Sequence, residues 1–287
     1  MKTLLSEINS LNFSLQYMTY AAQLAADINK PLKFLYVFNP DMYPLGMPDT
    51  TGDQVQFTAE NIEIISSSIN ERISANIEKI RRNISTELPI SFNLEFGFSQ
   101  NITENYIAQK NIDMTMVEGN AQENGSFLSD TNMKVIKRSS CPVWVIPTDM
   151  IYKPFTKIVY ASDYNEEDIS TLKKITDVAS VYSADIIALH ITDHNDFRER
   201  LNSRGFEKII NEKTGYDKIS FRLINEKKEN HFPNVLHDFI DSEKADLLVM
   251  LKENENFFEK IFTKSSVKEV INHLHIPMLV FHEKKQN

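Results

Sequence analysis

Apolar residues in this chain follow two repeating patterns. Short runs such as "DIIALHI" (Asp185–Ile191) and "DLLVML" (Asp246–Leu251) are apolar at nearly every position, which is typical of strands buried on both faces within a parallel sheet. Between such runs, apolar residues recur at helical spacing. One such set comprises Leu172, Ile175, Ala179 and Tyr182. Strands that alternate with helices predict a parallel α/β sheet with right-handed crossovers.

The same order of elements occurs twice along the chain. Three matched pairs are "ISFNL" (Ile90–Leu94) with "ISFRL" (Ile219–Leu223), "DMTMV" (Asp113–Val117) with "DLLVM" (Asp246–Met250), and "CPVWVIP" (Cys141–Pro147) with "IPMLVFH" (Ile276–His282). Leu24–Phe38 also aligns with Val178–Thr192 without a gap. Four matched segments in one order indicate an internal duplication. Each copy reads β-α-β-α-β-α-β-α-β, and the boundary near Met150–Pro154 predicts two domains, 1–150 and 151–287.

The first half carries extra length before its third strand. A stripe of isoleucines at helical spacing, from Ile62 to Ile84, predicts a long helix in this insertion. Two interpretations stay open at this point. The stripe is either an interaction face for a partner protein or the side by which the helix lies on its own sheet.

Composition narrows the classes of partner and compartment. The formal net charge of −9 argues against a nucleic-acid partner, which requires a basic face. No apolar run approaches the ~20 residues of a membrane helix, and the N-terminus turns polar after two leucines, unlike a signal peptide. The single cysteine, Cys141, precedes an apolar strand and is expected to be buried. We therefore expect a cytoplasmic protein without a membrane or nucleic-acid partner.

With these elements in place, the chain resembles the universal stress protein family in its tandem two-domain form. The resemblance rests on "SLQYMTYAAQLA" (Ser14–Ala25) after the first strand, "ASDYNEED" (Ala161–Asp168) at the end of its counterpart, "DLLVM" in the fourth strand, and "CP" or "IP" before the fifth. It implies two Rossmann-like, adenine nucleotide alpha hydrolase-like domains. Each is expected to hold a five-stranded parallel sheet of order 3-2-1-4-5 with helices on both faces.

Family members commonly pair through the fifth strand. For this chain the resemblance therefore implies an internal pseudo-dimer, in which the two domains pair through their fifth strands. Further association into a homodimer and binding of a protein partner both stay open.

Many members of the family bind ATP, with an aspartate after strand one and a glycine-rich loop after strand four. That loop reads G-x-x-G, nine residues, then G-S or G-T. Glycines let backbone N–H groups approach phosphate oxygens, and the final hydroxyl stands at a helix N-terminus. In the second half, Asp163 keeps the aspartate and Ser265 the serine, whereas the three glycine positions fall near Leu251, near Asn254 and on Lys264.

The first half departs further from this pattern. Asn9 replaces the aspartate, and Ser129 and Asp130 occupy the two positions that close the loop, although Gly119 keeps one glycine. A carboxylate at a helix N-terminus is a favourable cap and repels phosphate. Asp130 is thus expected to stand where a ligand phosphate would otherwise lie.

The candidate nucleotide or anion site is therefore in the second half, at Asp163, Lys264, Ser265 and Ser266. The competing interpretation is that both serines only cap a helix. Asp163, His190, Asp193 and His194 are expected to gather near strand ends as a polar cluster, for which we predict no metal. No P-loop, nucleophile elbow or H-E-x-x-H motif occurs.

These patterns predict a stress-response protein with a degenerate ATP loop. It would act by binding a partner or ligand, without catalysis and without a required cofactor. The alternative is an adenine-nucleotide sensor that works through the second domain. Slow ATP hydrolysis is a third hypothesis, for which the sequence supplies neither a general base nor a metal set.

Overall fold

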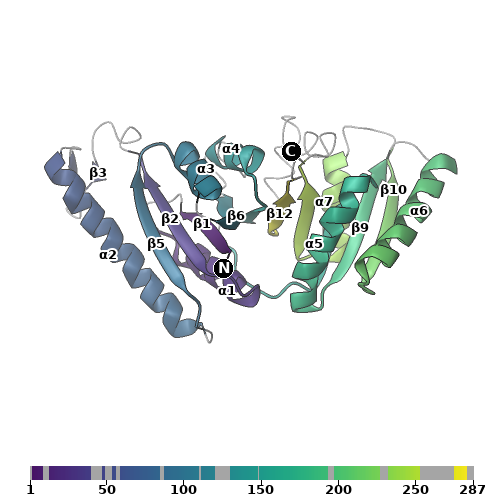
Figure 1. Cartoon of the computed structure of the whole chain (residues 1–287), viewed down its shortest axis with the longest axis horizontal. Helices are drawn as coiled ribbons and strands as arrows, with labels where there is room; N and C mark the ends of the chain where they lie inside the picture. Colours follow the sequence, from purple (N-terminus) through teal and green to yellow (C-terminus); the bar gives the residue numbers. More distant parts are fainter. Residues whose placement is uncertain are drawn as a thin grey trace. The chain divides into compact units, whose positions relative to one another are not determined.

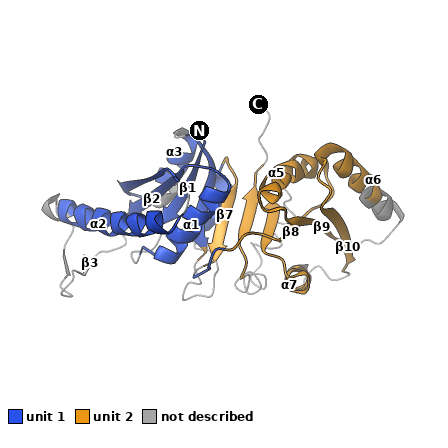
Figure 2. Ribbon diagram, turned by 90° about the horizontal axis from the view of Figure 1, so that it is seen from below, with its two compact units in different colours: residues 1–118, 131–139, 149–152 blue, residues 119–130, 140–148, 153–287 orange. Residues whose placement is uncertain are grey.

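The computed structural model describes residues 2–8, 13–39, 47–48, 54–55, 59–84, 87–109, 111–119, 130–147, 149–192, 197–226, 232–252 and 275–282. The chain forms two compact units, coloured separately in Figure 2. The first comprises residues 1–118, 131–139 and 149–152, and the second 119–130, 140–148 and 153–287. The predicted domain boundary near residue 150 stays a prediction, because the two units are not continuous in the sequence. Residues 119–130 and 140–148 belong to the second unit, and residues 149–152 to the first.

The first unit holds four parallel strands in the order β5-β2-β1-β6. Its elements are β1 (Thr3–Ile8), α1 (Leu15–Asp27), β2 (Leu32–Phe38), α2 (Ala59–Asn83), β5 (Ile90–Phe96), α3 (Ser99–Gln109), β6 (Ile112–Gly119) and α4 (Asp130–Arg138). A short antiparallel ribbon, β3 (Met47–Pro48) and β4 (Gln54–Val55), lies in the insertion and was not predicted. When these four strands alone are numbered by their order in the sequence, they lie in the predicted order 3-2-1-4.

The second unit repeats this arrangement and completes it. Its elements are β7 (Val143–Pro147), β8 (Lys157–Ala161), α5 (Glu166–Tyr182), β9 (Asp185–Thr192), α6 (Phe197–Thr214), β10 (Ile219–Asn225), α7 (Phe232–Glu243), β11 (Leu247–Leu251) and β12 (Met278–Phe281). The order β10-β9-β8-β11-β12 is the predicted 3-2-1-4-5, with all neighbours parallel. Helices cover both faces of the sheet, α5 and α6 on one and α7 on the other (Figures 1 and 2).

The strand β7, which closes the first repeat in the sequence, packs within the second unit. It pairs antiparallel with β12, so that Trp144 lies opposite Leu279. The Trp144 side chain is fully buried and stacks on Phe155 at 5.8 Å between ring centroids. Cys141, just before this strand, is buried as expected. Pairing of the two fifth strands thus uses buried, apolar side chains.

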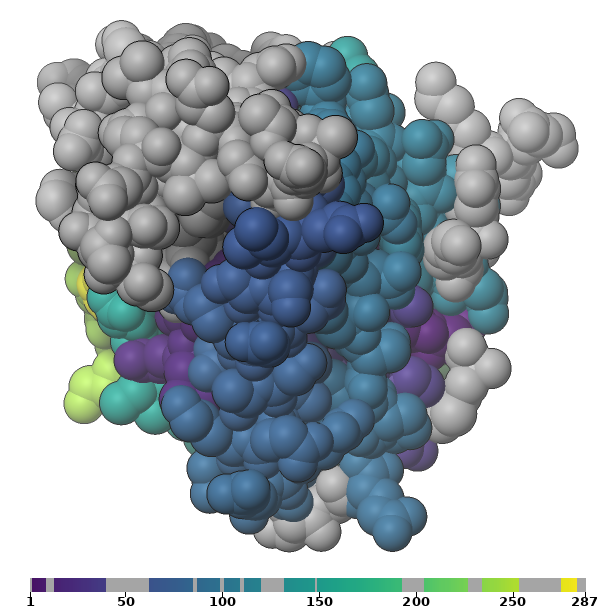
Figure 3. Space-filling view, turned by 90° about the vertical axis from the view of Figure 1, so that its left-hand side faces the viewer, coloured from purple at the N-terminus to yellow at the C-terminus, as the bar shows by residue number. Residues whose placement is uncertain are grey.

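The long helix α2 buries its isoleucine stripe on its own unit. Ile69, Ile73 and Ile80 are at most 3% exposed, and the helix lies beside α1 and β5 (Figure 1). Its opposite face is exposed (Figure 3) and mostly polar, with Ile64 as an exposed apolar residue. Of the two interpretations of the stripe, packing on its own sheet is therefore the one that holds.

The start of the second unit is held by the carboxylate of Asp246, which precedes β11. The backbone N–H groups of Thr156 and Lys157 donate to it at 2.8 and 3.1 Å, and the Thr156 hydroxyl also donates. Lys153 adds an ion pair at 2.7 Å. Burial by itself raises the pKa of this carboxyl, but the bonds from Lys153, Thr156 and Lys157 outweigh burial and lower the pKa.

The matched residue of the first repeat, Asp113, provides a comparison. It pairs with Lys30 at 2.6 Å, while its other carboxylate oxygen has no hydrogen-bond partner. We predict that Asp246→Ala lowers the free energy of unfolding by about 3 kcal/mol and Asp113→Ala by about 1 kcal/mol, because the first change removes the buried carboxylate that accepts three hydrogen bonds and an ion pair. Urea unfolding at neutral pH measures both.

The pH dependence of the Asp246 effect follows from the lowered pKa. Its stabilisation is complete above the ordinary carboxyl pKa and is lost as the pH falls through the lowered one. Losses of equal size for the two variants at neutral pH would contradict the role assigned to Asp246.

Candidate functional site

The candidate site of the second unit lies at the carboxyl edge of its sheet. Because β8 is parallel to both β9 and β11, the ends of all three strands meet at this edge. The strand order reverses between β8 and β11, and ligands of open α/β sheets bind at such reversals. Ser162, Asp163 and Tyr164 follow β8 directly, and His190 lies near the end of β9.

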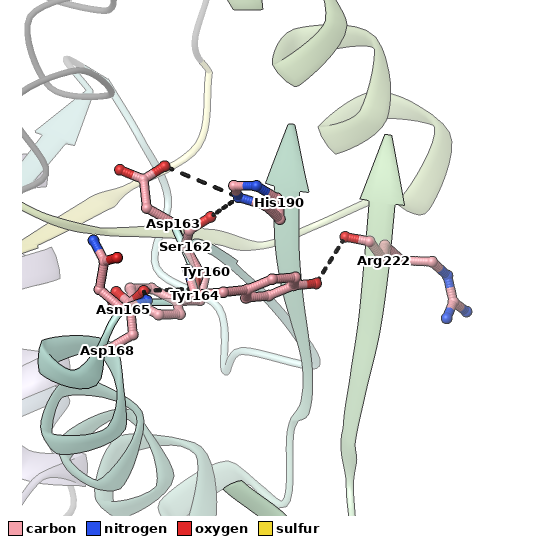
Figure 4. Close-up of polar contacts among 8 residues, drawn as sticks. All are labelled: Tyr160, Ser162, Asp163, Tyr164, Asn165, Asp168, His190 and Arg222. Carbon is pink, nitrogen blue, oxygen red and sulfur yellow. Dashed lines mark hydrogen bonds and ion pairs between the residues drawn. The ribbon is translucent and has the colours of Figure 1, made fainter. Parts of the chain in front are cut away.

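The turn after β8 is fixed by the fully buried carboxylate of Asp168 (Figure 4). The Tyr160 hydroxyl and the Ser162 hydroxyl both donate to it, the latter at 2.8 Å, and the backbone N–H of Asn165 donates at 2.9 Å. Burial, together with the charge of Asp168, raises the pKa of Tyr160 well above its usual value, so that the phenol stays a neutral donor. This network starts α5 as a capping arrangement does, and it holds the Asp168 carboxylate away from solvent.

Asp163 points away from that network and toward His190 (Figure 4). Its carboxylate lies 4.0 Å from Nδ1 of His190, and a quarter of its side chain (25%) is exposed. The same Nδ1 lies 2.7 Å from the carbonyl oxygen of Ser162. Since a carbonyl only accepts, Nδ1 carries the hydrogen, which assigns the imidazole tautomer.

The sequence-predicted residues are thus only partly brought together. Asp163 and His190 meet as expected, whereas Asp193, His194, Lys264, Ser265 and Ser266 lie outside the described residues. The helix expected to begin near Ser265 lies outside them too. Whether the anion site exists therefore stays a prediction.

Sequence reasoning missed Tyr164. Its backbone adopts the left-handed region, with φ of 57°. Its ring packs on those of His190 and Phe206, at centroid distances of 4.7 and 4.8 Å, and its hydroxyl lies 3.3 Å from the carbonyl oxygen of Arg222. The only signal in the sequence is an aromatic residue between the strand-end aspartate and a polar helix start.

The corresponding edge of the first unit carries two buried carboxylates. Glu7, near the end of β1, is fully buried and accepts a hydrogen bond from Thr103 at 3.0 Å. Glu118, near the end of β6, is 2% exposed, and its Oε2 has no hydrogen-bond partner. Burial, with a smaller contribution from the charge of Asp149, raises the pKa of Glu118 to about 7.

Of the other candidate site residues in the first half, the structure describes only some. Helix α4 begins at Asp130, as expected of a residue that opens a helix. Asn9 and Ser129 lie outside the described residues. The sequence did not single out Glu7 or Glu118, because it does not show how deeply a glutamate within an apolar strand is buried.

Comparison with known proteins shows which family the second unit is similar to. The model of the universal stress protein family matches residues 154–282. This segment of the chain is thus similar to universal stress proteins. The universal stress protein domain so defined begins just before β8 and includes β12, and thus spans the whole 3-2-1-4-5 sheet of the second unit.

Individual relatives agree with this assignment. A universal stress protein of Methanocaldococcus jannaschii is 24% identical over 144 residues, which cover 46% of this chain and 85% of that protein. The solved structure of a universal stress protein from Archaeoglobus fulgidus matches with a TM-score of 0.70 at 14% identity, covering 99% of this chain and 97% of that one. A Pseudomonas aeruginosa protein provisionally assigned to the same family matches with a TM-score of 0.58 at 13% identity, covering 98% and 93%. At such identities the structural matches support the fold alone.

Two features concern the part of the chain that the structure describes. Within it, no helix is both long and apolar enough to cross a membrane. Within the same residues, no group of three or more His, Cys, Asp or Glu side chains is arranged to hold a metal ion.

The raised pKa of Glu118 leads to a prediction. Because its pKa is about 7 in the folded chain and near 4.5 when solvated, the native state loses stability as the pH rises between these values. Glu118→Gln removes the buried charge, so we expect the variant to be more stable than the parent by about 2 kcal/mol at pH 8 and nearly equal to it at pH 5. Urea unfolding at the two pH values measures this difference.

The matched control is Glu87→Gln, which changes an exposed glutamate. It should alter stability little at either pH. If Glu118→Gln gave the same stability difference at pH 5 and pH 8, Glu118 would not titrate near neutrality.

Proposed function

We propose that this chain is a tandem universal stress protein with a degenerate ATP loop, and that it acts in the stress response by binding a partner or ligand without catalysis. The observation that carries the proposal is the set of carboxylates at both strand-end edges. In the first unit, Glu7 and Glu118 are buried there, and Glu118 has an oxygen without a hydrogen-bond partner. In the second, Asp163 is the partly exposed acid. When ionised, carboxylates at these positions oppose the phosphates of a nucleotide.

The loop that follows β11 strengthens this argument. From Lys252 to Lys264 the sequence is "KENENFFEKIFTK", which contains no glycine. Side chains at every position hinder the close approach of backbone N–H groups to phosphate oxygens. The second unit thus keeps the aspartate of the family pattern without its phosphate-binding glycines.

The tandem form and the compartment belong to the same proposal. The strand orders of the two units repeat one another, and the antiparallel pair of β7 and β12 supports pairing of the two repeats through their fifth strands. A cytoplasmic location follows from the composition, with its single buried cysteine.

One observation favours a second candidate function. Asp163 stays partly exposed beside His190, in the strand-end position at which family members hold the adenosine end of ATP. An adenine-nucleotide sensor using Asp163, Lys264, Ser265 and Ser266 is therefore the alternative. The two functions differ in whether the unmodified chain binds ATP.

Nucleotide binding by the purified full chain distinguishes them. A ligand at about a hundred times its dissociation constant stabilises a folded protein by about 2.7 kcal/mol, which corresponds to a Tm rise of several degrees. We expect ATP-Mg and AMP to leave Tm unchanged in both the parent chain and Asp163→Ala, and a denatured preparation to release no nucleotide.

The opposite outcome has an equally clear form. A stoichiometric adenine nucleotide in the supernatant, or a saturable rise in Tm that Asp163→Ala abolishes, would establish the sensor. Hydrolysis of ATP lost in the same variant would instead indicate an enzyme.

A further inference from the structure

Glu118 is an acid at a position that the fold does not require to be polar. It is 2% exposed, and among the described residues its Oε2 has no hydrogen-bond partner. The match of Asp113–Val117 with Asp246–Met250 places Leu251 at the same position of the second repeat, where it is 1% exposed. The second unit thus fills this position with an apolar side chain, whereas the first unit buries a carboxylate there.

A buried carboxylate without partners lowers stability once it is ionised. The buried acids of the second unit avoid this loss, because Asp168 and Asp246 each accept several hydrogen bonds. Residues that reduce stability and break a local rule of folding are expected mainly at functional sites. Glu118 is such a residue, and what it lacks is a hydrogen-bond donor or a positive charge.

The surroundings of Glu118 are acidic. Asp149, which is exposed, is held at this edge by a hydrogen bond from Gln16 of α1 to its carbonyl oxygen, and its charge acts on Glu118. Burial raises the pKa of the Tyr17 phenol well above its usual value, and the charges of Glu118 and Glu7 raise it further, so that Tyr17 stays neutral. Among the described residues, no lysine, arginine or histidine pairs with Glu118 or Asp149. The end of β6, which lies beside β1 (Figure 1), therefore carries uncompensated negative charge when Glu118 is ionised.

We propose that Glu118 and Asp149 form a binding site for a small protonated amine at the strand-end edge of the first unit. This rests on the proposed function, because it names the class of ligand that the chain binds there in place of a nucleotide. An ammonium group has only donors to offer, so it supplies the hydrogen bond that Oε2 of Glu118 lacks. Its positive charge also favours the ionised carboxylate.

Size and charge select this class of ligand. Because Glu118 is only 2% exposed, a compact cation reaches it more easily than the wide, planar fork of a guanidinium does. A divalent metal ion takes more oxygen ligands than two carboxylates supply, and within the described residues no group of three or more His, Cys, Asp or Glu side chains is arranged to hold one. Anions are repelled by the same charges. A primary amine meets all three conditions.

Thermal unfolding of the full chain with methylammonium chloride at pH 8 tests the site. Tetramethylammonium chloride at equal concentrations is the reference, because it carries the same charge without an N–H donor. Glu118→Gln keeps the shape of the side chain and removes its charge. The matched control is Glu87→Gln, which changes an exposed glutamate. The dependence of Tm on concentration gives an apparent dissociation constant for each variant.

We expect methylammonium to raise the Tm of the parent chain and of Glu87→Gln saturably, and tetramethylammonium to raise neither. Glu118→Gln should bind methylammonium at least about tenfold more weakly, because the amide offers no charge. Asp149→Asn should bind it only about threefold more weakly, because the charge of an exposed residue is screened by solvent. Glu118→Leu, which carries the residue of the second repeat, should behave as Glu118→Gln does and serves if that variant fails to fold.

A proton competes with the amine for Glu118. Burial, with a smaller contribution from the charge of Asp149, raises the pKa of Glu118 to about 7, so that the carboxylate is mostly ionised at pH 8 and mostly protonated at pH 5. An amine keeps its own proton at both pH values. The apparent affinity of the parent chain should therefore be about a hundredfold lower at pH 5 than at pH 8, whereas a site built on exposed acids alone would lose little.

The proposal is overturned if methylammonium leaves the Tm of the parent chain unchanged, if both salts raise it equally, or if Glu118→Gln binds methylammonium as tightly as the parent does. ATP-Mg added to the same preparations gives a separate result. Binding of ATP would contradict the degenerate loop, while the ratio of methylammonium affinities between the parent and Glu118→Gln would still decide the amine site.

Discussion

The central strand β8 is hydrogen-bonded on both sides, to β9 and to β11, and it is buried on both faces. A backbone in that position satisfies its N–H and C=O groups only through its two neighbours. Because all three strands run in one direction, their carboxyl ends must meet at one edge, and the chain leaving β8 must turn sharply there. The turn of Ser162 to Asn165, the position of His190 and the direction of the Tyr164 ring all follow from this pairing.

Buried carboxylates are the second constraint, and the two units meet it differently. In the second unit, Asp168 and Asp246 each accept several hydrogen bonds, which compensate for removing a charge from water. Both therefore act as fixed points of the structure. In the first unit, one oxygen of Glu118 has no hydrogen-bond partner, and the buried group keeps its proton up to a pH near 7. The same residue class is thus structural in one unit and titrates near neutrality in the other.

Duplication accounts for the likeness of the two units, and pairs of matched residues show where the units differ. The matched aspartates Asp113 and Asp246 begin the fourth strand in each repeat, yet only Asp246 holds the chain entering strand one. The aromatic rings of Phe13 and Tyr164 lie at matched positions, where Phe13 packs under Arg72 of α2 and Tyr164 packs on Phe206 of α6. A fold shared by two domains does not give them one function. In the second unit, Asp163 and Tyr164 at the strand-end edge both stay partly exposed.

The sequence by itself determined the order of elements, the repeat and the resemblance to a family, since apolar runs, helical spacing and matched segments are local features of the chain. It also pointed to Asp163, because the end of strand one can be located from the strand pattern. It did not disclose which acids are buried, because the depth of Glu7 and Glu118 depends on the helices and strands that pack around them. Nor did it disclose that Tyr164 meets His190, or that Phe13 meets Tyr36. Those pairs lie on different strands and turns, and only parallel pairing of strand one with strand two brings them into contact.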